Sequence, residues 1–513
     1  MLKILKLNKT EILILLGLIL LFFVLRLPNL TLQPIFADEA IYIRWAQVMK
    51  AEPTLRFLPL SDGKTPLFMW ALMPVFKVFA DPLFAGRFLS VISGFGTLLG
   101  VFLLGRTFLG KPAGFWGAFL IVVTPFMVFF DRMALVDSML AAFSIWALFL
   151  SLLLVKFPRL DLAMILGYFL GGGLLTKTPG FFNVFVLPVS LAIFNWKSEG
   201  RQNRLLKILG FWIVAIGITF VMYNLLRLGP GFVSLSGRNQ DYIFSPVDLI
   251  GRPLDPFIPH LNDLREWFPK LLTFPIMAAV FMGVVLTILQ KNRFVLAILF
   301  WGLLPLLVEL ALLRTFTARY ILFSIPPFLC LAGWAVAVSV EKIKMKKLLM
   351  LPLVVATLSV FALYYNFLIL TDPPRANLPV GERKGYLEAW TAGYGFPEIA
   401  EYLIKESQKG MVVVGTEGSF GTLPDGLQIY LDKHTHTASP QNQVIVIGGT
   451  ATVSAQIWES AEKHPTFYVA NESRFPKISP GLELIKEYPK AESDKLTHDS
   501  ILFFRVKPQG GQN

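Results

Sequence analysis

A few charged side chains stand out in this sequence because the segments around them are apolar. They are Asp38 and Glu39 in FADEAIY, Lys64 in GKTPLFMW, Arg132 and Asp137 in DRMALVDSML, Lys177 in TKTPG, and Arg319 with Tyr320 in ARYILFS. Cations hold a phosphate through charge-assisted hydrogen bonds, and a carboxylate can deprotonate or orient an incoming hydroxyl group. The set as a whole therefore suits a substrate that combines a phosphate, a sugar and a long lipid.

Four of these residues also have structural interpretations. Asp38 is a candidate N-cap of the helix that follows it, and Glu39 in the first turn would interact favourably with the helix dipole. Lys64 and Lys177, each shortly before a proline, are typical of lysines at a membrane surface. Considered singly, none of the four is persuasive as a catalytic or binding group.

The remaining residues have alternatives of the same kind. Arg132 could form a structural ion pair with Asp137 or with Asp131. Arg319 beside Tyr320, at the start of an apolar run, is typical of an anchor at the membrane interface. The choice between structural and chemical roles therefore depends on the elements that position these side chains.

The composition excludes a water-soluble globule. Of the 513 residues, 55% are hydrophobic and only 16% are charged, whereas soluble domains are about 25% charged. The length must therefore be interpreted as a number of bilayer crossings of about 20 residues each. The single cysteine, Cys330, lies in an apolar run, so the chain has no intramolecular disulfide.

Eleven apolar stretches are long enough to cross a membrane. They lie near residues 10–28, 83–105, 112–130, 138–155, 160–176, 179–196, 206–228, 270–289, 294–313, 320–340 and 348–370. Two of the connecting loops, near 29–82 and 229–269, are long. Segments of the first loop that begin at Phe36 and Ser61 are amphipathic or short and carry Trp, so we expect interfacial helices there.

The charges on the turns predict how the chain is oriented in the membrane. If the N-terminus is cytoplasmic, the cytoplasmic segments hold 17 basic and four acidic residues, as the positive-inside rule requires. Lys3, Lys6 and Lys9 precede the first apolar run, and no small-residue cleavage site follows it, so this run is expected to be an uncleaved anchor. We predict a multi-pass protein of the cell membrane whose candidate site residues all face the outer side.

The composition changes after Leu370. From there the chain is polar, and MVVVGT from Met411, VIVIGG from Val444 and TFYVAN from Thr466 predict short buried strands with helices between them. We therefore divide the chain into a membrane domain, residues 1–370, and a C-terminal domain, residues 371–513. No GxGxxG motif accompanies the glycines at the strand ends, which favours a structural or acceptor-binding role over a nucleotide site.

The expected fold is thus an all-α polytopic membrane protein of about eleven transmembrane helices, with interfacial helices in the first outer loop and a small extracytoplasmic α/β domain. The net charge of +13 follows from this topology. The membrane domain holds 33 basic and 17 acidic residues, and the C-terminal domain holds 14 and 17. The basic balance therefore does not indicate a nucleic-acid partner.

The combination of motifs resembles a family of membrane enzymes. The acidic pair in the first outer loop, KTPLFMW, DRMALVDSML, TKTPG and RYILFSIPPF together are similar to the integral-membrane C-type glycosyltransferases. The likeness is to the bacterial branch that comprises protein O-mannosyltransferases and the aminoarabinose transferase of lipid A. It covers about residues 1–370 and is most specific in Asp38 with Glu39, Lys64 and Asp137.

The resemblance implies transfer of a sugar from a polyprenyl-phosphate carrier to a glycan, lipid or protein acceptor on the outer face of the membrane, without a cofactor and with inversion at the anomeric carbon. Asp38 would act as the base or would position the acceptor. Asp137 would be the second acid near the reacting centre, and Lys64 would neutralise the carrier phosphate. The other residues would adjoin the substrate, the phosphate and the lipid groove; they are Glu39, Arg132, Lys177, Arg319 and Tyr320.

The sequence also departs from the family pattern. Gly63 precedes Lys64, where the similar aminoarabinose transferases carry a Glu that helps to hold a metal. His260 in the second long loop then lacks a matching ligand, and no metal site is predicted. No outer loop is long enough for the β-trefoil domain of eukaryotic protein O-mannosyltransferases, and the C-terminal domain leaves the acceptor unspecified.

Two other classes of protein are alternatives to a transferase. A transporter or flippase of lipid-linked sugars would also need cations, but it predicts charges through the bilayer midplane and broken helices in matched halves. A membrane-anchored scaffold would leave Asp38, Lys64 and Asp137 unexplained. Most spans here carry no charge at their centres and the polar set is one-sided, which favours the transferase.

Overall fold

The computed structural model describes residues 7–342, 347–435, 442–449, 452–475, 479–492 and 499–508, without the side chains of 347–349. The lysines at positions 3, 6, 344 and 346, which belong to the predicted cytoplasmic segments, lie outside the described residues. The chain forms two compact units. The first comprises Met1–Asn29, Thr54–Phe68 and Arg87–Pro379, and the second comprises Leu30–Pro53, Met69–Gly86 and Val380–Asn513.

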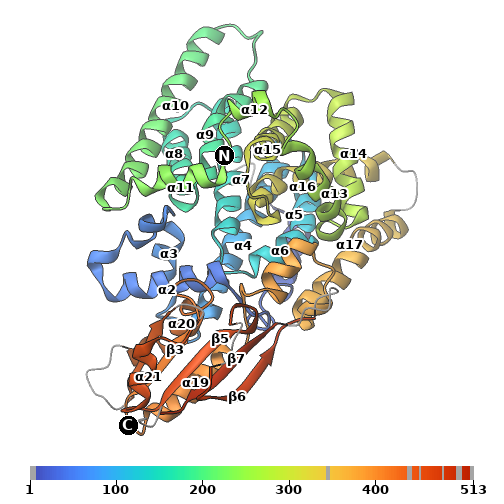
Figure 1. Cartoon of the computed structure of the whole chain (residues 1–513). Helices are drawn as coiled ribbons and strands as arrows, with labels where there is room; N and C mark the ends of the chain where they lie inside the picture. The colour runs from blue at the N-terminus through green and yellow to red at the C-terminus, as the bar shows by residue number, and fades with distance from the viewer. Residues whose placement is uncertain are drawn as a thin grey trace. The chain divides into compact units, whose positions relative to one another are not determined.

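The first unit is built from helices (Figure 1). Long apolar runs form helices because a helix satisfies its main-chain hydrogen bonds internally, as a bilayer requires. The α-helices of this unit are α1 (Lys9–Val24), α4 (Pro82–Phe108, from Arg87 onward), α5 (Lys111–Val123), α6 (Pro125–Asp131), α7 (Val136–Lys156), α8 (Leu160–Thr176), α9 (Phe181–Phe185), α10 (Arg201–Asn224), α11 (Ser234–Tyr242), α12 (Asp248–Gly251), α13 (Phe257–Leu271), α14 (Phe274–Gln290), α15 (Arg293–Leu312), α16 (Ile325–Lys342) and α17 (Lys347–Thr371).

Six helical segments in the described part of the chain are long and apolar enough to cross a membrane. They are Pro82–Phe108, Val136–Lys156, Arg201–Leu228, Arg293–Leu312, Ala318–Lys342 and Met350–Thr371. The number rises to eight if two bent pairs each count as one span, namely α5 with α6, bent by 59°, and α13 with α14, bent by 119°. The first bend falls at Pro125, which cannot donate a main-chain hydrogen bond.

The predicted number of eleven spans is not confirmed. The apolar segments Leu160–Thr176 and Thr178–Ile193 are shorter than 18 residues, and α1 has 16 residues. At 1.5 Å per residue, such helices are shorter than a hydrocarbon core of about 30 Å. The structure therefore supports a mostly helical protein with six to eight candidate spans among the described residues.

The second unit contains a five-stranded sheet in the order β4-β3-β5-β7-β6. Its strands are β3 (Val412–Thr416), β4 (Val444–Gly448), β5 (Thr466–Asn471), β6 (Leu482–Pro489) and β7 (Ser500–Val506). β3 pairs in parallel with β4 and β5, whereas β7 pairs antiparallel with β5 and β6. The three strands predicted from apolar runs are confirmed, and β6 and β7 are additional.

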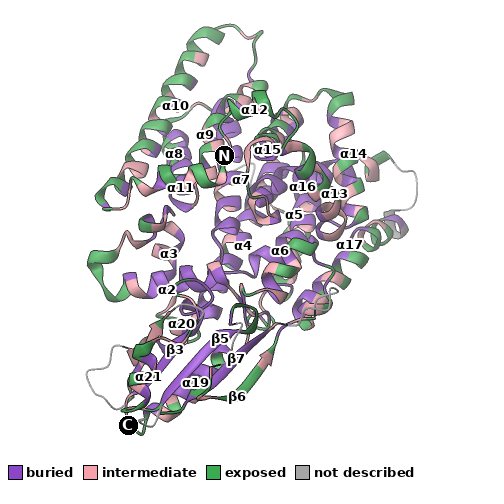
Figure 2. Ribbon diagram, viewed as in Figure 1, coloured by how far each residue is buried: buried purple, intermediate pink, exposed green. Residues whose placement is uncertain are grey.

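The central strands of the sheet are buried, whereas the edge strand β6 is exposed. Every residue of β5 and all but one of β7 are buried, whereas β6 is mostly exposed or half-buried (Figure 2). Tyr468, Phe475 and Phe504 pack in the core on one face. The helices of the α/β domain are α18 (Val380–Arg383), α19 (Phe396–Ser407), α20 (Asp425–Thr435) and α21 (Ala455–Ala461).

Parts of the first long loop also belong to the second unit. They include β1 (Ile35–Phe36), α2 (Ala37–Ala51) and the part of α3 (Leu67–Val75) that begins at Met69. β1 pairs antiparallel with β2 (Ala392–Gly393), and α2 packs against α20. The helix predicted from Phe36 onward is therefore present, and most of its residues are buried. These segments of the first long loop thus fold in one unit with the C-terminal α/β domain.

Candidate active site

Asp137, Lys177 and Tyr320 come together in the first unit. The Lys177 Nζ atom lies 2.6 Å from Asp137 Oδ1 and donates a hydrogen bond to it. The same ammonium group lies over the Tyr320 ring, 4.2 Å from its centroid. Asp137 is 3% exposed, and Lys177 is 22% exposed. Three residues that are far apart in the sequence thus form one charged cluster at the ends of helices.

The helix ends explain how this cluster is positioned. Asp137 is the second residue of α7, where the helix dipole favours a negative charge. Lys177 is the C-cap of α8, and its main-chain N–H donates to the Gly173 carbonyl at 3.1 Å. A cation at a helix C-terminus is stabilised by the opposite end of the dipole. The TKTPG motif therefore places its lysine beside the acid that begins the preceding helix.

Glu309 joins this cluster and is a residue whose role sequence reasoning missed. It lies in α15, is 2% exposed, and interacts electrostatically with Lys177 and Asp137. Its Oε2 atom has no hydrogen-bond partner among the described residues. An ionisable residue inside an apolar span is by default a functional candidate, and this was the signal available in the sequence.

Arg319 lies at the edge of the same cluster. Its guanidinium group is 5.4 Å from the centroid of the Tyr320 ring. Both residues lie in the 3₁₀ segment Ala318–Ser324, which leads into α16. The arrangement brings a second cation to the aromatic ring that Lys177 contacts, and both residues are half-buried.

Arg132 lies in a different set of contacts. Its guanidinium group donates to the main-chain carbonyls of Arg26, Pro28 and Asn29 at 2.6 to 2.8 Å. Asp131 pairs with Arg26 at 2.9 Å, and both side chains are fully buried. The ion pair considered between Arg132 and Asp137 or Asp131 is therefore wrong. Arg132 therefore has a structural role, since it stabilises the segment that follows α1.

Lys64 follows a tight turn whose glycine is required by geometry. Gly63 has a φ angle of +64°, which a residue with a side chain rarely adopts, and a Cβ atom there would collide with Arg238. Lys64 Nζ lies 3.4 Å from Asp62, and the guanidinium group of Arg238 lies 3.9 Å from the same carboxylate. Two cations therefore converge on one acid. Arg238, from the second long loop, was not singled out from the sequence.

Asp38 and Glu39 lie in the second unit, at the start of α2. The N-cap is Phe36, and Asp38 is the second residue of the helix, so the interpretation of Asp38 as the N-cap is wrong. Glu39 Oε2 accepts a hydrogen bond from the main-chain N–H of Phe36 at 3.0 Å. Glu39 is fully buried, whereas Asp38 is half-buried. The acidic pair thus divides into a capping residue and a more accessible one.

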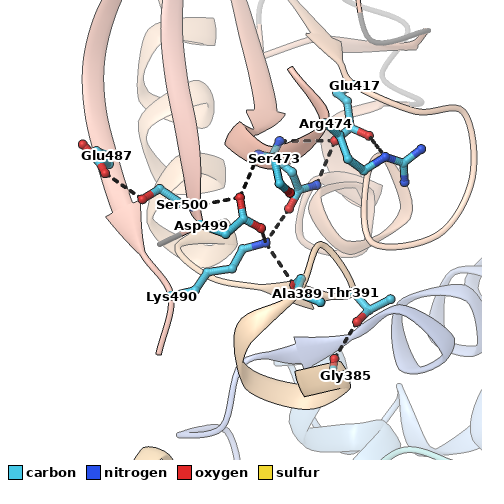
Figure 3. Close-up of polar contacts among 11 residues, drawn as sticks. Gly385, Ala389, Thr391, Glu417, Ser473, Arg474, Glu487, Lys490, Asp499 and Ser500 are labelled. Carbon is cyan, nitrogen blue, oxygen red and sulfur yellow. Dashed lines mark hydrogen bonds and ion pairs between the residues drawn. The ribbon is translucent and has the colours of Figure 1, made fainter. Parts of the chain in front are cut away.

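A polar network in the C-terminal domain fixes the segment that pairs with the start of α2. Figure 3 shows the Lys490 ammonium between Asp499 and the carbonyl of Ala389, at 2.7 and 3.1 Å. Thr391 donates to the carbonyl of Gly385 at 2.6 Å. Burial lowers the pKa of Lys490, and Asp499 opposes this effect. The segment that contains Ala389 and Thr391 continues into β2, which pairs with β1 shortly before Asp38.

Further contacts hold α2 along its length. The guanidinium group of Arg44 lies 2.6 Å from Asp432 in α20, and the Gln47 side-chain amide donates to the carbonyl of Ile429 at 2.8 Å. Trp45 packs on Phe420 with ring centroids 5.9 Å apart. The C-terminal domain therefore determines both the start and the course of the helix that carries Asp38.

The predicted site residues are thus divided between the units. Asp38 and Glu39 lie in the second unit, and the first unit contains Lys64, Arg132, Asp137, Lys177, Arg319 and Tyr320. Asp137, Lys177, Arg319 and Tyr320 form one cluster, whereas Lys64 lies with Arg238 and Arg132 lies with Arg26. Each of these groupings places charge at the ends of apolar helices or in the loops between them.

The residue considered for a metal has other contacts. The His260 ring lies with Nδ1 2.9 Å from the carbonyl of Leu310, and it stacks on Phe316 with centroids 4.3 Å apart. Among the described residues, no group of three His, Cys, Asp or Glu side chains is arranged to hold a metal ion. His260 therefore acts as a packing residue between α13 and α15 in this structure.

Comparisons with known proteins agree with this arrangement. Residues 63–226 match the model of the dolichyl-phosphate-mannose-protein mannosyltransferase family. The fold is similar to ArnT from Cupriavidus metallidurans in the apo state, with 17% identity, a TM-score of 0.61, and coverage of 96% of this chain and 97% of that chain. The form of ArnT bound to undecaprenyl phosphate matches with 16% identity, a TM-score of 0.56 and the same coverage. No protein of curated function matches the sequence.

The two kinds of match are complementary. The family model spans the turns that hold Lys64, Asp137 and Lys177, and the structural match extends over nearly the whole chain, the C-terminal domain included. The chain therefore has the fold seen in ArnT, and part of it matches the mannosyltransferase family model; both findings agree with the resemblance that its motifs predicted.

Proposed function

We propose that this protein is a membrane glycosyltransferase that moves a sugar from a polyprenyl-phosphate carrier to an acceptor hydroxyl on the outer face of the cell membrane. The observation that mainly supports the proposal is the charged cluster of Asp137, Lys177 and Tyr320, in a chain with the fold of a protein that was solved with undecaprenyl phosphate. Apolar spans suit the lipid, and the cations suit the phosphate. The N-terminus would be cytoplasmic.

In this proposal, Asp38 accepts the proton of the acceptor hydroxyl while the oxygen of that hydroxyl attacks the anomeric carbon. The bond between that carbon and the phosphate oxygen breaks, and the polyprenyl phosphate leaves with the electron pair. Lys64, assisted by Arg238, stabilises the negative charge on the leaving phosphate. Asp137 holds Lys177 near the reacting sugar.

The C-terminal domain has a defined task in this mechanism. It supplies β2, which pairs with β1, and Asp432, which pairs with Arg44 of α2. A base must be held within hydrogen-bond reach of the hydroxyl that it deprotonates, so the orientation of α2 matters for the rate. We therefore assign the domain a positioning role for Asp38, in addition to any contact with the acceptor.

Replacement of Asp38 by Asn tests the proposal. Membranes that contain the Asp38→Asn protein, supplied with a panel of radiolabelled polyprenyl-phosphate sugars, should transfer no sugar although the wild-type protein does, because an amide does not accept the proton. Lys64→Ala should abolish transfer as well. Glu52→Gln, at the exposed opposite end of α2, is the matched control and should retain activity.

Two results would contradict this proposal. Full activity in Asp38→Asn would remove the base from the mechanism, and release of no polyprenyl phosphate by the wild-type protein with any donor would remove the reaction. Transbilayer movement of an intact lipid-linked sugar, without cleavage of the phosphate bond, would instead support the transporter alternative.

A further inference from the structure

The first unit contains a basic depression at the end of α7 that lies opposite Asp137. α7 has 21 residues, so its two ends are roughly 30 Å apart. At the end that holds Lys156, a depression of about 540 Å³ is lined by Lys156, Phe157, Pro158, Arg159, Asn203, Arg204 and Lys207. These residues come from the turn between α7 and α8 and from the first turns of α10, and none of them takes part in the proposed reaction.

Close packing of α8 on α10 creates this arrangement. A Cβ atom at Gly167 would lie 2.7 Å from the main-chain oxygen of Ala215, so the two helices approach more closely than a larger residue allows. The Thr219 hydroxyl donates to the carbonyl of Gly167 at 3.2 Å. The contact brings the basic start of α10 beside the turn that precedes α8.

Arg204 completes the wall of the depression. Its guanidinium group donates to the carbonyls of Val155 and Lys156, at 3.2 and 3.0 Å, in the last turn of α7. A cation at that position is stabilised by the helix dipole. Because these acceptors are uncharged carbonyls, the positive charge of Arg204 is not neutralised by them.

The depression carries more positive than negative charge. Arg159 pairs with Asp161 at 2.6 Å. In the part of the chain that the structure describes, neither Lys156 nor Lys207 has a carboxylate within 4.0 Å; their ammonium groups lie over the rings of phenylalanines at 5.3 to 5.8 Å. Three cations therefore remain without a counter-charge around one hollow. Mutual repulsion favours occupation by an anion.

The surface below the depression identifies the kind of anion. Leu160 and Met164 of α8 and Leu206 and Ile213 of α10 are large apolar residues with exposed side chains, Ile213 being 72% exposed. Helices of this kind face lipid in a membrane. A molecule that fits both surfaces has a phosphate for the cations and acyl chains for the apolar side chains. Basic pockets of this kind at the ends of spanning helices bind anionic head groups.

We propose that the depression between the α7–α8 turn and the start of α10 is a binding site for the phosphate head group of an anionic phospholipid. The acyl chains of the lipid lie along the exposed faces of α8 and α10. Lys156 and Lys207 supply the positive charge that attracts the anion. Arg204 positions the start of α10 against the last turn of α7. The proposal does not depend on the proposed glycosyl transfer.

Lipid binding by the purified full-length protein tests this site. The protein is placed in nanodiscs of phosphatidylcholine with 20 mol% phosphatidylglycerol, and the lipid that it retains on transfer to detergent is counted by native mass spectrometry. The wild-type protein should retain phosphatidylglycerol in preference to phosphatidylcholine. The double variant Lys156→Gln/Lys207→Gln should bind phosphatidylglycerol at least about tenfold more weakly, because each cation contributes about a factor of five to anionic lipid binding.

The control variant removes two cations from other predicted cytoplasmic turns. Lys291→Gln/Lys342→Gln changes exposed lysines that do not line the depression and should retain phosphatidylglycerol as the wild type does. Equal loss in both double variants would reduce the effect to general surface charge and overturn the site. Equal retention of the two lipids by the wild type would do so as well. Competition by soluble glycerol phosphate as strong as by the lipid would assign the site to a free phosphate compound and overturn the lipid proposal.

Discussion

Asp131 and Asp137 are six residues apart in one motif, yet their ion pairs differ in kind. Asp131 and Arg26 are both fully buried, and Arg26 also donates to the carbonyls of Val122 and Ile121 at 3.1 and 3.0 Å. Every nitrogen of that guanidinium group thus has a protein acceptor. Among the described residues, the Lys177 ammonium group has one hydrogen bond, to Asp137, and the side chain is partly exposed. The first pair is inaccessible because both side chains are buried, although Asp131 Oδ1 has no hydrogen-bond partner among the described residues, whereas the second pair retains an accessible donor.

The difference shows how to separate structure from chemistry in such motifs. A buried pair whose donors are all satisfied by the fold contributes to folding, because loss of one partner leaves an uncompensated charge. A pair with an accessible donor, an aromatic face and a second acid beside it is arranged for a substrate. The Asp137 cluster has these features through Tyr320 and Glu309.

The largest effect is expected from breaking the closed pair. Asp131→Asn should prevent accumulation of folded protein, since a buried unpaired Arg26 costs about 3–5 kcal/mol. The combined change Arg26→Gln/Asp131→Asn should restore most of the yield, because no charge is then left unpaired. Size-exclusion chromatography with a thermal challenge measures both. Asp161→Asn, in an exposed pair, should behave as the wild type.

The next effect should appear in activity and not in folding. Lys177→Met should lower sugar transfer by about 10²–10³-fold, since it removes a cation near developing charge. The protein should still fold, with a smaller loss of stability than Asp131→Asn causes, since Lys177 is partly exposed. Lys111→Met is the matched control, because Lys111 forms an equally short pair with Glu11, at 2.7 Å, but is 58% exposed. If Lys177→Met fails to fold while Lys111→Met folds, the Asp137–Lys177 pair would be as necessary for folding as the Asp131–Arg26 pair. The distinction between the two pairs would then be wrong.

A smaller effect is expected at a third ion pair, between Arg44 and Asp432. Arg44→Asp should lower the rate constant kcat for transfer by roughly tenfold with little change in KM for the donor, because it loosens the helix that carries Asp38. The charge-exchanged variant Arg44→Asp/Asp432→Arg should recover much of the rate. Absence of any recovery, with both single variants folded, would show that the contact does not act through the position of α2.

The smallest effect should come from the aromatic face beside Lys177. Tyr320→Leu should reduce transfer by about three- to tenfold, because it removes a cation–π contact worth about 0.5–2 kcal/mol. Tyr320→Phe keeps the ring and should be within about twofold of the wild type. A large loss in the phenylalanine variant would instead give the hydroxyl group a direct role with the substrate.

The sequence predicted those features that local composition determines. Apolar runs predicted most of the spans and three strands of the sheet, since these segments are buried on one or both faces. β6 was missed because it is an edge strand with mostly exposed side chains, and such a strand has no apolar run to reveal it. The predicted number of eleven spans is not confirmed, because an apolar run in the sequence does not show where its helix begins and ends.

The partners of the charged residues could not be predicted from the sequence. Asp131 pairs with a residue 105 positions earlier, and Lys177 pairs with one 40 positions earlier. Glu39 caps its helix through a carboxylate that bonds to the N–H of Phe36, a residue type that gives no capping signal. Only the fold could determine which of two neighbouring acids would meet which cation.

The pairing of β1 with β2 has a consequence for biosynthesis. Ile35 lies opposite Gly393, so the strand that begins the acidic helix meets its partner only after 358 further residues have been translated. At about 5–20 residues per second, this takes roughly 20 to 70 s. During that interval the membrane helices are made while the helix bearing Asp38 lacks its docking partner. The nascent chain can therefore form the strand pair beside Asp38 only after Gly393 has been translated.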